Sequence, residues 1–345
     1  MEPSGAIDLQ PWMSEPETAA VMAALAADGD VARFVGGCVR NAILGKPVDD
    51  VDIAITAPPD AVMRLLGKAG IKAVATGIEH GTVTAVSGRR HFEITTLRRD
   101  AETFGRKARV EYTDDWIEDA KRRDFTFNAL YCDADGTLYD PCDGLDDLRN
   151  GRVRFVGSAA ARIAEDYLRV FRFFRFLAWY GRPPADEEAL EAIAVAAPLL
   201  ATLSGERVQK ELLRLLAASD PVPAASLMHR AGVLVLWLPE SPNASGLAPL
   251  LRIEQANGLA PDGLRRLAAM LETDPDVDAL AKRLKLSRAA HSRLASALAA
   301  EPRVVSLDAR SVRALVYRAG NVVAGDRLAL HAARAGIGPA HPALV

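Results

Sequence analysis

The chain has 345 residues, half of them hydrophobic and a quarter charged, with a formal net charge of −3. This length predicts two or three domains, and the composition excludes a disordered chain. The net charge excludes a protein that is basic throughout, so any nucleic-acid site must be a local patch. From Gly246 onwards there are 14 lysines and arginines against 9 aspartates and glutamates, an excess mild enough to arise by chance.

The first 155 residues alternate between strand-like and helical patterns. Residues 1–30 predict an arm and one short helix. Strands are expected at Arg33–Val35 and Val51–Thr56, with a helix after each, and two further β-like runs follow, GTVTAVSG and RRHFEITTLR. This alternation predicts an α/β or α+β domain over residues 31–155.

Beyond Val156 the strand patterns stop, and helical segments separated by Pro and Gly fill the rest of the chain. One long helix is expected over ARIAEDYLRVFRFFRFLAWYG. An all-helical arm of this kind is one way to hold a long substrate.

Three cysteines, Cys38, Cys132 and Cys142, form no CxxC pair, and their odd number argues against a disulfide framework. Free thiols are typical of a reducing compartment, which predicts a cytoplasmic location. The acidic N-terminal segment has no signal-peptide core, and no apolar stretch is long enough to cross a bilayer. We therefore expect no membrane association.

Two aspartates, Asp50 and Asp52, flank Val51 at the start of a predicted strand. Alternate residues of a strand share a face, so both carboxylates should emerge together. Such like charges favour a cation between them, and carboxylate oxygens suit Mg²⁺. Glu93, between Phe92 and Ile94, is the candidate for a third carboxylate. An acidic turn and an ordinary solvent-facing Glu93 are the alternatives.

The pair Gly36-Gly37 separates a predicted strand from a predicted helix, and Arg40 lies one turn further on. Glycine lets backbone amides approach a phosphate, and Arg40 would face the same anion. The run Lys121-Arg122-Arg123 predicts a basic cluster, or simply a solvated charge run.

Four charged residues recur at every third position of one apolar segment: Asp166, Arg169, Arg172 and Arg175. On a helix this spacing makes one slanted row, with phenylalanines on the other faces. One acid cannot neutralise three arginines, so the row predicts an anionic ligand.

Seven motifs occur in a fixed order between Arg33 and Leu216: GGxVR, DxD, EHGTVT, FEITTLR, RRDFTFNAL, EDYLRVFRFFRF and SGERVQKEL. This ordered set resembles the family of class II tRNA nucleotidyltransferases and bacterial poly(A) polymerases. The resemblance implies an α+β fold, with a nucleotidyltransferase head (31–155) that has a small mixed sheet and flanking helices. A helical neck (156–245) and a helical body and tail (246–345) that contacts tRNA would follow.

The resemblance also implies roles for single residues. Asp50 and Asp52 match the metal-binding pair, for Mg²⁺. Nucleotide binding is implied for the positions Gly37, Arg40, Arg123, Asp166, Arg169, Arg172 and Arg175. Asn41 departs from the family, which usually has Asp there, and this puts the local hydrogen bonding of the loop in question.

An Asp–Arg pair such as Asp166 and Arg169 has the right polarity to select bases. Cytosine and adenine both offer an amino donor beside a ring-nitrogen acceptor, whereas uracil and guanine present a carbonyl beside an N–H. The sequence thus favours addition of C and A from CTP and ATP to the 3′ end of tRNA, with no obligate protein partner. A poly(A) polymerase and a non-catalytic RNA- or nucleotide-binding protein remain as alternatives.

Overall fold

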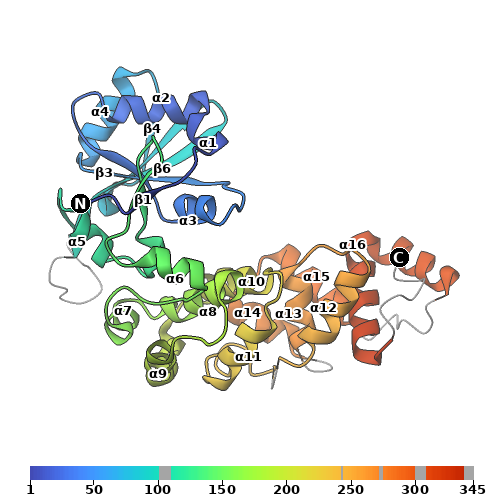
Figure 1. The fold of residues 1–345 in the computed structure, drawn as a ribbon. Helices are drawn as coiled ribbons and strands as arrows, with labels where there is room; N and C mark the ends of the chain where they lie inside the picture. The colour runs from blue at the N-terminus through green and yellow to red at the C-terminus, as the bar shows by residue number, and fades with distance from the viewer. Residues whose placement is uncertain (101–109, 242–243, 272–274, 300–307, 338–345) are drawn as a thin grey trace. The chain divides into compact units, whose positions relative to one another are not determined.

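A computed structural model of the chain describes residues 1–100, 110–241, 244–271, 275–299 and 308–337 (Figure 1). The chain divides into two compact units, Met1–Ala159 and Ala160–Val345. The first contains a mixed sheet with helices, and the described part of the second is entirely helical. This confirms the predicted α+β class with a helical continuation.

An eight-stranded sheet forms the centre of the first unit, in the order β1-β10-β9-β2-β3-β6-β5-β4. Within it β3 and β6 run parallel, and the other neighbouring strands are antiparallel. A separate two-stranded sheet pairs β7 with β8. The strands are β1 Gly5–Ala6, β2 Ala32–Val35, β3 Val51–Ile55, β4 Lys72–Gly77, β5 Thr82–Ser87, β6 Arg90–Thr96, β7 Arg98–Asp100, β8 Val110–Tyr112, β9 Tyr131–Cys132 and β10 Thr137–Tyr139.

The helices of this unit connect and cover the strands. Phe34, Ile53 and Phe92 of the sheet are fully buried, and the apolar face of α4 adds Val62 and Leu66 to the core. The helices are α1 Pro11–Ser14, α2 Pro16–Leu25, α3 Gly37–Ile43, α4 Pro59–Lys68, α5 Trp116–Lys121 and α6 Gly144–Asn150, with 3₁₀ turns η1 Ile78–His80 and η2 Thr126–Asn128. The strands predicted at Arg33–Val35 and Val51–Thr56, and the helix predicted after each, are therefore confirmed.

The second unit is a series of helices, among which α8 packs against α10 and α11. They are α7 Ala159–Glu165, which begins at the last residue of the first unit, α8 Leu168–Tyr180, α9 Glu187–Ala196, η3 Ala197–Thr202, α10 Gly205–Leu216, α11 Val222–Arg230, α12 Leu247–Ala256, α13 Gly263–Met270, α14 Val277–Leu284, α15 Arg288–Leu298 and α16 Ala309–Ala335. None of the helices that the structure describes is long and apolar enough to cross a membrane.

The prediction of one helix through residues 161–181 was wrong. α7 ends at Glu165 and α8 begins at Leu168. The Asp166 side chain accepts a hydrogen bond from the backbone N–H of Leu168, at 3.1 Å. Aspartate competes in this way with the backbone for a helix N–H, and so favours a new helix start over continuation.

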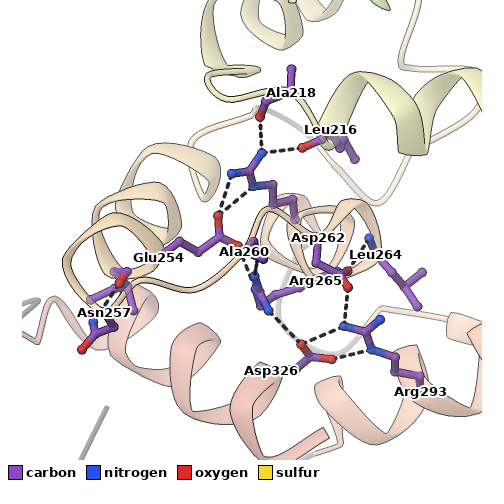
Figure 2. A network of polar contacts seen from close by, with 12 residues as sticks. Leu216, Ala218, Glu254, Asn257, Ala260, Asp262, Leu264, Arg265, Arg293 and Asp326 are labelled. Carbon is purple, nitrogen blue, oxygen red and sulfur yellow. Dashed lines mark hydrogen bonds and ion pairs between the residues drawn. The ribbon is translucent and has the colours of Figure 1, made fainter. Parts of the chain in front are cut away.

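A buried charge network joins α12, α13, α15 and α16 (Figure 2). Glu254, 1% exposed, accepts hydrogen bonds from Arg265 and Arg266 at 2.7 and 2.8 Å. Arg266 also donates to the carbonyl oxygens of Leu216 and Ala218, where α10 ends. The charged groups of this network are paired, as buried charges must be. The bonds from Arg266 connect α13 to the end of α10.

Candidate active site

Two carboxylates of the first unit lie on neighbouring parallel strands. Asp52 of β3 is the register partner of Glu93 on β6, so the two side chains leave the same face of the sheet. Asp50 immediately precedes β3. Asp52 is half-buried, whereas Asp50 and Glu93 are exposed. The structure thus brings Glu93 beside the aspartate pair, although 41 residues of chain separate it from Asp52.

The electrostatics at Asp52 show how closely these charges act on one another. Burial, together with the negative charges of Glu93 and Asp50, raises the pKa of the Asp52 carboxyl to about 6, and Arg123 and Arg40 partly oppose this rise. Carboxylates that repel one another in this way are hard oxygen donors that a divalent cation would stabilise. No group of three or more His, Cys, Asp or Glu ligands gathers around one point among the described residues. Two carboxylates are enough for Mg²⁺, which usually takes one or two and completes its shell with water and phosphate.

The glycine pair forms the turn between β2 and α3. Gly36 has φ of 71°, a left-handed conformation that glycine adopts without strain, and Gly37 is the first residue of α3. Arg40 is buried, and its Nη1 and Nη2 donate to the side-chain oxygens of Asn128 and Asn41. Asn41 in turn donates to the Pro47 carbonyl at 2.8 Å, so asparagine makes the hydrogen bonds of this loop.

The three cations of Lys121-Arg122-Arg123 are paired with acids of α5. Lys121 pairs with Glu118 at 2.7 Å, while Arg122 and Arg123 both bind the fully buried Asp119. The acids precede the cations by three or four positions, which places them one helical turn away. Sequence reasoning missed Asp119, although that spacing was visible.

In the second unit, Arg169, Arg172 and Arg175 form a half-buried row on α8, between buried phenylalanines. The premise that a single acid faces the three arginines was wrong. Glu165 pairs with Arg169, and the buried Glu211 of α10 lies 2.5 Å from Arg175 and 3.8 Å from Arg172.

Asp166 has a partner on another helix. Arg207 of α10 donates to its Oδ2 at 2.7 Å, from 41 residues along the chain. Tertiary packing therefore supplies acids to the arginines and a cation to the aspartate.

The candidate residues fall into two groups. One group lies in the first unit and consists of Gly37, Arg40, Asp50, Asp52, Glu93 and Arg123. The other is the Asp166–Arg175 segment of the second unit. The first group combines carboxylates suited to a cation with two arginines suited to phosphate. The second combines an acceptor and donors with the polarity of a base edge.

Comparison with known proteins places these groups in context. Residues 32–154 match the family described as Poly A polymerase head domain, and residues 185–244 match the probable RNA and SrmB-binding site of polymerase A. CCA tRNA nucleotidyltransferase 1, mitochondrial, of Danio rerio is 41% identical over 263 residues, covering 74% of this chain and 60% of that protein. The CCA-adding enzyme of Geobacillus thermodenitrificans is 41% identical over 213 residues, covering 61% and 51%. The chain therefore spans about half to three fifths of these relatives.

A solved structure gives the same fold over more of the chain. The Bacillus stearothermophilus CCA-adding enzyme in complex with CTP superposes with a TM-score of 0.76 at 29% identity, covering 96% of this chain and 81% of that one. The shared architecture thus includes helices beyond the matched sequence.

Proposed function

Because the chain belongs to the family of class II tRNA nucleotidyltransferases and bacterial poly(A) polymerases, we propose that it adds C and A residues to the 3′ end of tRNA from CTP and ATP. The observation that carries this proposal is the register pairing of Asp52 with Glu93, next to Asp50, within the electrostatic reach of Arg40 and Arg123. It supports the proposal because two carboxylates and two guanidinium groups act on one another at one site.

Asp50 and Asp52 would hold Mg²⁺, and Glu93 would add negative charge beside Asp52 from the neighbouring strand. When bound, Mg²⁺ ions lower the pKa of the attacking 3′-hydroxyl and stabilise the charge on the departing pyrophosphate. In the reaction the RNA 3′-oxygen would form a bond to the α-phosphorus, the bond to pyrophosphate would break, and the hydroxyl proton would pass to water.

The basic residues of the first unit would bind the triphosphate. Arg123 and Arg40 supply guanidinium donors, and Gly37 lets the backbone approach. Because these groups are held by Asp119 and Asn128 before substrate arrives, little reorganisation is needed on binding.

Base selection would fall to the second unit. Asp166 would accept from the amino group of C or A, and Arg169 would donate to the ring nitrogen, with Arg172 and Arg175 completing the row. The helices after Gly246 would contact the tRNA body. The three free cysteines suit a reducing compartment, and we propose a cytoplasmic location on that ground.

The test is incubation of the purified chain with tRNA that lacks its 3′ end, using CTP, ATP or both. Incorporation of C followed by A supports the proposal, and Asp50→Ala should abolish it without changing the circular dichroism spectrum. Long tails made from ATP alone on unrelated RNA would instead identify a poly(A) polymerase. Binding without incorporation would identify a non-catalytic protein.

A further inference from the structure

One buried carboxylate in the first unit has more donors than a simple ion pair needs. Asp119 of α5 is 0% exposed. Its Oδ2 accepts from Nε and Nη2 of Arg123, at 3.2 and 2.9 Å, and from the Tyr131 hydroxyl at 2.7 Å. Its Oδ1 accepts from Nε and Nη2 of Arg122, at 2.9 and 2.6 Å, and from the backbone N–H of Arg98 at 3.3 Å.

The two arginines on this carboxylate have different surroundings. Arg123 uses one edge of its guanidinium on Asp119, and its Nη1 lies beside Gly36, 3.9 Å from where a Cβ on that glycine would stand. The charge of Arg123 also acts on Asp52. Arg122 instead donates to the backbone carbonyl of Arg98, at 3.1 Å. Only Arg123 is therefore oriented toward the glycine turn and the carboxylates.

Ionisation of Asp119 is secured by its partners. Burial alone would raise the pKa of the carboxyl, but Arg123 and Arg122 more than offset this and hold it below the usual range. The carboxylate is therefore ionised around neutral pH, where its pairing with Arg123 does not depend on titration. Two N–H groups of Arg123 that donate to one buried oxygen also fix the guanidinium plane, which a water-exposed arginine would not keep.

We propose that Asp119 is a positioning residue, which presents the free edge of Arg123 to the triphosphate of the incoming nucleotide. The inference rests on the proposed function and extends it to a residue that touches neither substrate nor metal. Asp119 acts through Arg123 alone, and its bond to Arg122 serves the packing of α5.

A double-mutant cycle on nucleotide use separates this role from stability. Asp119→Asn should raise the CTP Kd, and lower kcat/KM for CTP, by roughly tenfold to a hundredfold, the scale of one charge-assisted hydrogen bond. In an Arg123→Ala background the same change should alter both by less than about twofold, since there is nothing left to position. In an Arg122→Ala background it should keep its full effect, which makes Arg122 the matched control.

An equal effect of Asp119→Asn in all three backgrounds would overturn the proposal, because a structural residue acts additively. Tyr131→Phe repeats the cycle if Asp119→Asn fails to fold, since it removes a hydroxyl that donates to Oδ2 and accepts from Arg123 Nε, and leaves both ion pairs. The CTP Kd is measured in the absence of tRNA, so that it does not depend on nucleotide addition. If the wild-type chain adds nothing to tRNA, the proposed function fails while the binding cycle still decides the role of Asp119.

Discussion

Substitutions of Asp166 can test whether this residue selects the base of the incoming nucleotide or only helps to bind its phosphates. In the structure Oδ1 accepts from the N–H of Leu168 and Oδ2 accepts from Arg207. Asp166→Ala deletes both acceptors. Asp166→Asn keeps an oxygen for the helix start and places an NH₂ group where Oδ2 stood, so it reverses the polarity offered to a base. The two variants should therefore change nucleotide choice differently.

The expected size follows from one base-edge contact. Such a contact is worth about 1–3 kcal/mol of discrimination, and about 1.4 kcal/mol is a factor of ten. The ratio of CTP to UTP use should fall by about tenfold or more in Asp166→Ala. In Asp166→Asn it should fall further, because the amide donates to the uracil carbonyl. Asp166→Ala should also lose about 1 kcal/mol of stability, because it removes the acceptor for the Leu168 N–H at the start of α8, and Asp166→Asn should lose much less.

The assay is kcat/KM for each of the four nucleotides with each variant. Asp186→Asn is the matched control, since Asp186 caps α9 in the same unit and has no proposed role in base reading. If both Asp166 variants lower kcat/KM equally for all four nucleotides, base recognition by Asp166 is refuted. Asp166 would then serve only to neutralise nearby arginines or to stabilise the fold.

Three further predictions concern charge. Asp52→Asn should abolish nucleotide addition yet, without divalent cations, stabilise the fold at pH 7.5 by about 2–3 kcal/mol. Because folding raises the pKa of Asp52 from 3.8 to about 6, ionised Asp52 destabilises the folded state increasingly as pH rises through this range. The melting temperatures of the wild type and Asp52→Asn should therefore approach each other as pH falls to about 4. Glu254→Gln should lower the free energy of unfolding, measured in urea, by about 3–5 kcal/mol. The control Glu206→Gln, which breaks an exposed ion pair, should lower it by less than about 0.5 kcal/mol. Replacing the exposed Arg313 and Arg318 by alanine should weaken tRNA binding and flatten its salt dependence by about one unit per lost phosphate contact; an unchanged slope would exclude α16 from the RNA interface.

The sequence by itself determined the fold class, the family, and the local elements around the site motifs. A β-branched strand beginning at Val51, and a glycine pair before Arg40, carry their structure within a few residues, since periodicity and backbone freedom are local properties. Asp50 and Asp52 could be named as candidates for the same reason. The roles given to the site residues stay predictions.

Only the tertiary structure decided which side chains meet. Glu93 reaches Asp52 through the parallel pairing of β3 with β6, and Glu211 and Arg207 reach the Asp166–Arg175 segment because α10 packs on α8. The acids beside the arginine row were undercounted from sequence: Glu211 lies 36 residues from Arg175, although Glu165 is only four from Arg169. Strand register and helix packing depend on the whole buried core, and no short stretch of sequence contains them.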